Sequence, residues 1–278
     1  RPAAQPLNER FQGPRFMKIA IVGSGISGMA AAYLLNPQHD VWLFEKEQRL
    51  GGHSRTVTVN DGHKNVAIDT GFIVFNQRNY PNLTRLFDRL EVPVAKSDMS
   101  FGVSINDGWL EYGTLRLSDM IAQKRNLFRL DFLRMVYDIL RFNRQARAYV
   151  GANPTASLEE CLDQLQLSAW FRHYYLLAMA GAIWSSPAGQ MTQFPAQTLI
   201  HFFDNHGLLS LADPIQWYTV QGGSQVYVDR LTQSYADKIH YGAGITRVRR
   251  TAEGVELRDS QGQWHPFDQV VLACHSDQ

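Results

Sequence analysis

The chain has 278 residues, a formal net charge of +1 and 45% hydrophobic residues. This length favours one large or two modest domains, each able to bury a core, and the balanced charge gives no reason to expect nucleic acid as a partner. Cys161 and Cys274 lie far apart without metal or redox spacing, which favours reduced thiols in a cytoplasmic protein. No apolar run reaches the roughly 18 residues that a membrane-spanning helix needs, and Tyr174 to Trp184, the longest, predicts a buried helix.

Residues 1–16 are polar, contain three prolines and lack the apolar core of a secretory signal. We expect them to form a disordered leader.

The first elements predict a βαβ unit. Lys18 to Val22 is typical of a buried parallel strand, Ile26 to Leu35 is an alanine-rich helix, and Val41 to Phe44 is a second strand. The turn between the first strand and the helix, residues 23–28, fits G-x-G-x-x-G. In that position the three glycines allow a tight turn, close approach of a pyrophosphate, and packing of helix on strand.

Glu45 ends the second strand, 17 residues after Gly28. A carboxylate there accepts hydrogen bonds from ribose hydroxyls and repels a 2′-phosphate, which disfavours NADP. Just beyond it, Gly51 and Gly52 predict a second glycine-rich bend that reaches back to the pyrophosphate, with His53 and Ser54 as donors. An NAD-binding unit needs no second cradle there, so the pattern favours FAD.

The later elements change in character along the chain. Two further strands are expected at Thr56 to Asn60 and Val66 to Ile68, and helices at 82–90 and about 116–180. From residue 221 the pattern predicts a helix and then four strands, at Gln225 to Tyr235, Ile239 to Tyr241, Ile245 to Arg249, Val255 to Arg258 and Gln269 to Ala273.

One predicted helix combines an apolar stripe with basic residues. The stripe is Leu130, Leu133, Tyr137 and Leu140, and the basic residues are Arg129, Arg134, Arg141, Arg144 and Arg147. The pattern favours a stripe that faces the core and a basic face in solvent. The alternative is a face that contacts anionic lipid headgroups.

Together these motifs resemble the flavin-containing amine oxidase and phytoene desaturase superfamily, most closely its bacterial branch of predicted NAD/FAD-binding oxidoreductases. The resemblance begins with the βαβ unit and continues through Glu45–Ser54 and Asp69-Thr70-Gly71-Phe72. Ala182-Ile183-Trp184-Ser185-Ser186, Asn205–Leu209 and Gln221–Ser224 extend it. It implies an α/β fold in which a discontinuous Rossmann-like FAD-binding domain, 17–95 and 221–278, receives a mostly helical substrate domain, 96–220, as an insertion.

The resemblance also implies which residues bind FAD. Those of the pyrophosphate turn are Gly23, Gly25, Ile26, Ser27 and Gly28. The ribose acid is Glu45, with Lys46 beside it, and the second cradle is Gly51, Gly52, His53 and Ser54. Gly71, Phe72 and Ile73 would run beside the isoalloxazine, and the backbone of Val248 would meet the adenine.

Two residues depart from the family pattern. His53 stands where amine oxidases usually carry Arg, and Glu47 replaces a basic residue often found near the ribose. The chain also stops at Gln278, where related proteins pass into their last third. We therefore expect a truncated chain that keeps the ADP half of the site better than the half that performs chemistry.

The expected function is FAD-dependent oxidation, with a hydride equivalent passing from an amine or an apolar, lipid-like C–H to the flavin. A non-redox flavin-dependent isomerase or mutase, and a non-catalytic dinucleotide-binding module, remain as alternatives. No catalytic residue is assigned and no metal site is expected: His173, His201, His206 and His240 could carry protons, but structural roles are favoured for each. The substrate is expected to be a small molecule, and the protein is expected to be cytoplasmic. Peripheral contact with the inner face of the membrane and the oligomeric state stay open.

Overall fold

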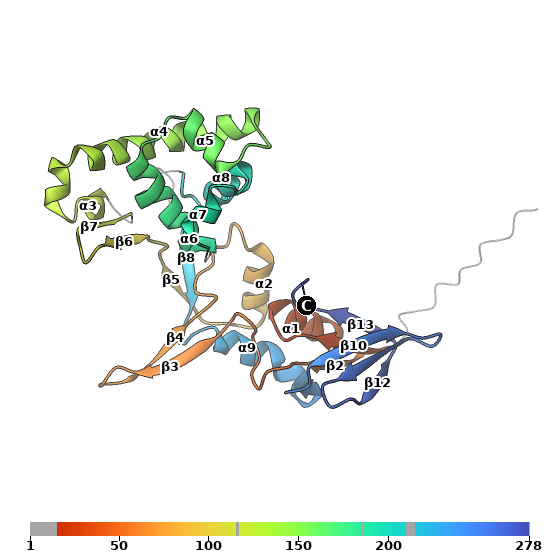
Figure 1. Ribbon diagram of the computed structural model, residues 1–278. Helices are drawn as coiled ribbons and strands as arrows, with labels where there is room; N and C mark the ends of the chain where they lie inside the picture. Colours follow the sequence, from red (N-terminus) through yellow and green to blue (C-terminus); the bar gives the residue numbers. More distant parts are fainter. Residues whose placement is uncertain (1–15, 115–116, 185, 210–214, 278) are drawn as a thin grey trace, which may run out of the picture. The chain divides into compact units, whose positions relative to one another are not determined.

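A four-stranded parallel sheet joins strands from opposite ends of the described chain (Figure 1). The computed structural model describes residues 16–114, 117–184, 186–209 and 215–277. β1 (Lys18–Val22) lies between β2 (Asp40–Phe44) and β13 (Gln269–Leu272), and β9 (Ile239–His240) pairs with the far side of β2. Parallel neighbours require a crossover connection, which α1 (Ile26–Leu35) supplies between β1 and β2. The predicted α/β fold with a discontinuous Rossmann-like part is confirmed.

The chain divides into two compact units. Unit 1 runs to Ile73, resumes for Asn82–Ala95, and resumes again at Thr219. Unit 2 consists of Val74–Pro81 and Lys96–Tyr218, so Val74–Pro81 groups with the helical unit although the sequence analysis drew its border at residue 95. The chain passes between the units within β5 (Val94–Ser97) and β8 (Trp217–Val220). The predicted leader falls, apart from Phe16, outside the described residues.

Unit 1 contains further elements besides the parallel sheet and α1. The elements are β3 (Thr56–Asn60), β4 (Asn65–Asp69), α2 (Pro81–Arg89), α9 (Gln225–Thr232), the 3₁₀ helix η3 (Gln233–Lys238), β10 (Ile245–Arg250), β11 (Val255–Asp259) and β12 (Trp264–Phe267). β10, β11 and β12 form an antiparallel sheet whose Leu257 and Phe267 share a core with Ala20 and Phe44 of the parallel sheet. β12 is absent from the sequence prediction because it contains Pro266. A strand tolerates proline at a sheet edge, and β12 is an edge strand.

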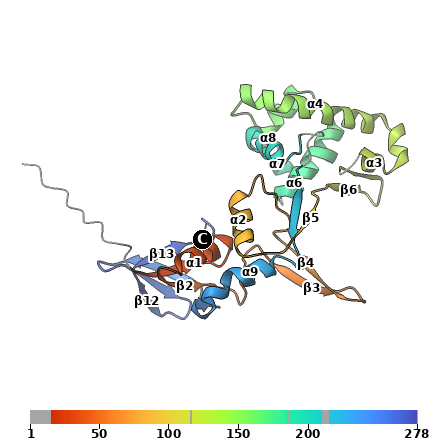
Figure 2. The same cartoon turned by 180° about the vertical axis from the view of Figure 1, so that it is seen from behind.

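Unit 2 is mainly helical, and Figure 2 shows its elements from behind. They are β6 (Gly102–Ile105), β7 (Leu110–Gly113), α3 (Leu117–Met120), η1 (Lys124–Phe128), α4 (Leu130–Ala152), α5 (Leu158–Gln164), the π-helix η2 (Phe171–Leu176), α6 (Leu177–Trp184), α7 (Ala188–Met191) and α8 (Ala196–Asn205). The buried helix expected at Tyr174 to Trp184 is confirmed as the end of η2 and all of α6. The β6–β7 hairpin is absent from the sequence prediction, although the turn Asn106-Asp107-Gly108 between alternating apolar residues signals it. Among the described residues, no helix is long and apolar enough to span a bilayer.

The orientation of α4 differs from the favoured prediction. Leu130, Leu133, Tyr137 and Leu140, expected to face the core, are all exposed. The core is instead filled by the opposite side of the helix, whose buried apolar residues are Phe132, Met135, Ile139, Phe142, Ala146, Tyr149 and Val150. Both sides of α4 carry apolar residues at helical spacing. Unit 2 buries the side that carries more aromatic residues.

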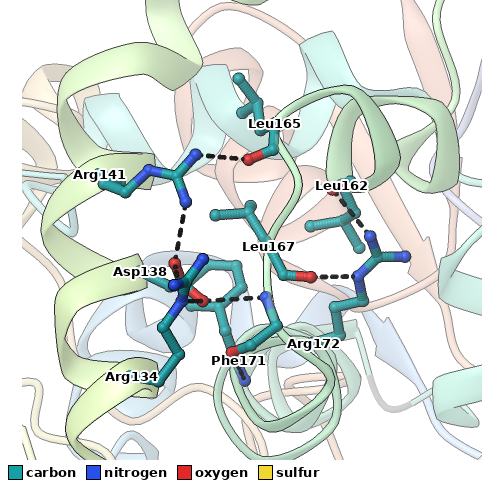
Figure 3. Close-up of polar contacts among 9 residues, drawn as sticks. Arg134, Asp138, Arg141, Leu162, Leu165, Leu167, Phe171 and Arg172 are labelled. Atoms are coloured by element: carbon teal, nitrogen blue, oxygen red, sulfur yellow. Dashed lines mark hydrogen bonds and ion pairs between the residues drawn. The ribbon is translucent and has the colours of Figure 1, made fainter.

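A buried carboxylate, Asp138, also lies on the inner side of α4 (Figure 3). Its oxygens accept hydrogen bonds from Arg141 Nη1 at 3.1 Å and from the Ser168 backbone N–H at 2.9 Å, and Arg134 forms an ion pair at 3.4 Å. Arg141 also donates to the Leu165 carbonyl at 2.7 Å. Burial opposes ionisation, but the Ser168 hydrogen bonds and the Arg134 charge outweigh it and lower the pKa of Asp138. This carboxylate joins α4 to the segment between α5 and η2.

Asp138→Asn tests this connection. The amide keeps the shape but loses the charge, so we expect the free energy of unfolding of unit 2 to fall by about 1.5–3 kcal/mol, the range for hydrogen bonds to charged groups. Because the pKa of Asp138 is lowered on folding, its stabilisation is present above about pH 4 and is lost as the pH falls through the lowered pKa. Urea unfolding at neutral pH and at acidic pH measures both effects: the difference between wild type and variant should shrink in acid. A difference that is equal at both pH values would contradict this role.

Candidate functional site

The turn after β1 is closed by a buried carboxylate at the end of β2. Glu45 Oε2 accepts hydrogen bonds from the Ser24 backbone N–H at 3.0 Å and from Ser24 Oγ at 2.5 Å, and Oε1 accepts from the Glu47 N–H at 2.9 Å. Gly23 has a φ of +102°, and a Cβ there would lie 2.8 Å from the Ala273 carbonyl oxygen. Only glycine fits that conformation and that approach. The sequence placed Glu45 at this edge correctly but did not foresee that it holds the turn.

The helix that follows the turn begins without a cap. Gly25 is the N-cap of α1, it offers no side-chain hydrogen bond, and the first turn contains no acidic residue. A Cβ on Gly25 would meet no atom within 4 Å, so open space lies before the helix N-terminus. Unpaired N–H groups and the helix dipole make such an end favourable for an anion.

The second glycine segment lies directly against this helix end. The Gly51 N–H donates to the Ser24 carbonyl at 3.0 Å, and a Cβ on Gly52, whose φ is +58°, would lie 3.0 Å from the Gly25 Cα. Ser54 hydrogen-bonds the buried hydroxyl of Tyr227 on α9. Burial raises the pKa of the Tyr227 phenol, which keeps its proton and the hydrogen bond. Two glycine turns 27 residues apart in sequence therefore form one surface.

A cavity of about 560 Å³ opens on this surface, within the range of small-molecule sites. Its walls come from the β1–α1 turn, the end of β2, the second glycine segment, the start of β10 and the residues after β13. Of the residues expected to bind FAD, those that line it are Gly23, Gly25, Ile26, Ser27, Glu45, Lys46, Gly51, Gly52, His53 and Ser54.

Five expected residues do not line the cavity. Gly28 lies behind it, where a Cβ would approach the Gly23 carbonyl oxygen to 1.9 Å, so its role is the close packing of helix on strand. A Cβ on Gly71 would likewise lie 1.9 Å from the His53 carbonyl oxygen. Phe72 and Ile73 follow Gly71 along the chain. Val248 is 41% exposed on β10, while Gly244 and Ile245, at the start of that strand, line the cavity.

The cavity also contains residues that the sequence analysis did not find. Arg49 donates to the Gly52 carbonyl at 2.9 Å and adds a cation to the wall. Ala273, Cys274 and His275, which follow β13, line the opposite part, and the His275 ring stacks on His53 at 5.1 Å between centroids. No local pattern marks these three residues, because only the pairing of β13 with β1 brings them there.

Asp69 ties the β3–β4 hairpin to the start of α9. Its carboxylate accepts hydrogen bonds from the Ser224 N–H at 2.9 Å, from Ser224 Oγ at 2.8 Å and from Thr56 Oγ1 at 2.6 Å. Thr56 Oγ1 in turn accepts from the Gln225 N–H at 2.9 Å. The start of α9 is thus capped by protein groups, unlike that of α1.

The four histidines considered as proton carriers lie in different environments. His240 stacks on Trp42 at 4.7 Å and on Phe44 at 5.0 Å in unit 1, and burial, with nearby His265 and Lys18, lowers its pKa, so a structural role fits. In unit 2, His206 stacks on Phe202 at 3.8 Å and its Nδ1 lies 2.7 Å from the Phe202 carbonyl. His173 and His201 are exposed.

Several solved structures share this fold. A putrescine oxidase variant with redesigned cofactor binding superposes with a TM-score of 0.67 at 20% identity, over 92% of this chain and 57% of that one. Cyclohexylamine oxidase from Brevibacterium oxydans gives 0.63 at 19% identity, over 93% and 58%. A conjugated-linoleic-acid-producing fatty acid isomerase from P. acnes gives 0.60 at 18% identity, over 93% and 59%. The chain spans a little under three fifths of the length of these proteins.

The family comparison is more specific. The family model described as flavin containing amine oxidoreductase matches residues 26–278, which include Glu45, the second glycine segment and the strands that return to the parallel sheet. This match confirms the resemblance and the predicted flavin cofactor. The chain belongs to the flavin-containing amine oxidoreductase family.

Proposed function

We propose that unit 1 binds the ADP half of FAD in the cavity between its two glycine segments. The observation that carries the proposal is the convergence, on one cavity, of the uncapped α1 N-terminus, two glycine turns in contact and the carboxylate of Glu45. Each has a counterpart in the ligand: the pyrophosphate for the helix end and the glycines, and the ribose for the carboxylate.

The residues present fit this group. The open space at Gly25 lets a pyrophosphate approach the backbone, and Arg49 and Lys46 contribute positive charge to the wall. A carboxylate has about four acceptor positions, and protein donors use three of those on Glu45. One position therefore remains for a ribose hydroxyl, a smaller role than the sequence analysis assigned.

The other FAD contacts are proposals of the same kind. Gly71, Phe72 and Ile73 remain candidates for the segment beside the isoalloxazine, and the packing of Gly71 on the second glycine segment supports this. For the adenine, Gly244 and Ile245 are better candidates than Val248, because they line the cavity.

We further propose that the protein oxidises a small organic substrate, an amine or an apolar C–H compound. FAD supplies the acceptor for a hydride equivalent, and the chain holds and orients it. Membership in an oxidoreductase family favours this over a non-redox isomerase or an inactive binding module. A cytoplasmic location and contact with a membrane surface remain predictions.

The first test is the cofactor itself. Purified protein should carry flavin absorbance, and FAD added at about 100 times its Kd should raise the free energy of unfolding by about 2.7 kcal/mol. Thermal melts with FAD, NAD and ADP-ribose measure this, and anaerobic bleaching by small amines or acyl lipids identifies the substrate class. Colourless protein that NAD stabilises and FAD does not would refute the proposal.

A pair of glycine substitutions separates binding from folding. Gly25→Ala adds a methyl group to open space, so the unliganded protein should unfold like wild type while FAD affinity falls at least about tenfold, the effect of a 1.4 kcal/mol penalty. Gly28→Ala forces a Cβ against the Gly23 carbonyl and should destabilise the protein with or without ligand. Full FAD affinity in Gly25→Ala would place the pyrophosphate elsewhere.

Glu45→Ala and Ser24→Ala divide the two roles of the carboxylate. Glu45→Ala should lower the free energy of unfolding of unliganded protein by about 1–3 kcal/mol, because buried donors lose their acceptor, and should also weaken FAD binding. Ser24→Ala removes one donor and leaves Glu45 in place, so its FAD affinity should stay near wild type. Equal losses of FAD affinity in both variants would mean that Glu45 acts only by holding the turn.

A further inference from the structure

The segment from η1 through α4 concentrates positive charge. Between Lys124 and Ala152 there are seven basic and two acidic side chains, a net charge of +5, whereas the whole chain carries +1. Part of this charge is paired, since Asp138 binds Arg134 and Arg141 and Asp204 binds Arg147. Lys124, Arg125 and Arg144 remain as exposed cations that suit an anionic partner.

The same segment exposes large apolar side chains. Phe128 is 88% exposed and Leu130 83%, and Leu127, Leu133, Tyr137 and Leu140 are exposed as well. Single exposed apolar residues need no explanation, but a contiguous group bordered by charges usually marks a binding surface. We call these six residues, together with Arg134, Arg141 and Arg144, the α4 outer face.

Helical spacing places those of the side chains that belong to α4 on one side of it, and Leu127 and Phe128 lie in η1 just before it. Positions 130, 133, 137, 140 and 144 recur at intervals of three or four, so they share one side. The buried residues of α4 fill the opposite side, and Figures 1 and 2 show α4 along the border of unit 2 with α6 and α8 on one flank. The Arg134 and Arg141 guanidinium groups lie 5.7 and 5.8 Å from the Tyr137 ring centroid. Basic groups therefore border the apolar stripe.

We propose that the α4 outer face docks on the surface of an anionic lipid bilayer. An amphipathic helix lies in a membrane interface when its apolar residues enter the headgroup boundary and its Lys and Arg residues meet anionic headgroups. Tyrosine and arginine suit this depth, because each has an apolar body and a polar end. The exposed Phe128 and Leu130 provide the apolar insertion. The exposed Arg144, with the half-exposed Arg134 beside it, provides the headgroup contacts.

Charge argues against a second copy as the occupant. A two-fold dimer on this face would bring identical basic patches together, and like charges in an interface are unfavourable. An anionic bilayer supplies both properties of the face at once. The proposal goes beyond the proposed function and does not depend on it, since docking needs no flavin.

Vesicle co-sedimentation tests the proposal. The purified chain, with whatever flavin it carries, is mixed with phosphatidylcholine vesicles, with or without phosphatidylglycerol. Wild type should co-sediment only with the anionic vesicles. The double variant Phe128→Ser/Leu130→Ser should lose about tenfold or more in partitioning, and Arg144→Glu about fivefold or more. All three changed positions are exposed, so circular dichroism melts should show unaltered folding.

Two control variants on unit 1 change an exposed leucine and an exposed arginine that lie outside the α4 outer face. Leu34→Ser removes a leucine that is 61% exposed on α1, and Arg250→Glu reverses an exposed arginine on β10, and both should bind vesicles like wild type. The proposal fails if wild type does not bind, if it binds neutral vesicles equally, or if the controls lose as much as the face variants. It also fails if sedimentation velocity shows a dimer that the face variants abolish. Since partitioning is read without turnover, a chain without flavin or activity leaves this result interpretable.

Discussion

The buried carboxylate of Glu45 determines the geometry at the ends of β1 and β2. Removing a carboxylate from water is costly unless donors replace the water, and here Ser24 and the Glu47 backbone provide them. Those hydrogen bonds hold the turn that begins α1, and the Ser24 carbonyl then receives the N–H of Gly51. One satisfied charge therefore connects two strand ends, a helix start and the second glycine segment.

The starts of α1 and α9 in unit 1 show how the fold separates structural from ligand-binding ends. α9 begins beside Gly222 and Gly223. The Ser224 N–H donates to the Asp69 carboxylate, and the Gln225 N–H donates to Thr56 Oγ1. α1 begins beside glycines too, but no side chain caps it. A helix leaves its first N–H groups unpaired within the helix, and no side chain in the described part of the chain caps those of α1. The cavity lies at that end.

In unit 2, α4 balances the burial of apolar side chains against the cost of desolvating arginines. α4 buries its more aromatic side and the satisfied carboxylate of Asp138, and it leaves leucines, a tyrosine and arginines outward. Burying both sides would require desolvating those arginines without enough acceptors. The outward side therefore keeps apolar side chains beside positive charge, a combination that suits the boundary between the headgroups and acyl chains of a membrane.

The sequence by itself determined the elements whose signal is local. The first strand, the glycine turn, α1, β2 and Glu45 follow from apolar runs, from glycine offsets and from a carboxylate at a strand end, and this is why the α/β fold and a dinucleotide site could be predicted. The second glycine bend and the family resemblance then favoured FAD. Only the tertiary structure decided which of two apolar sides α4 buries, since periodicity records spacing and not the partner. It also decided that Ala273, Cys274 and His275 reach the cavity, because the pairing of β13 with β1 spans some 250 residues. The tertiary structure also decided which groups donate hydrogen bonds to the Glu45 carboxylate. Hydrogen-bond partners depend on positions in space, which local sequence does not encode.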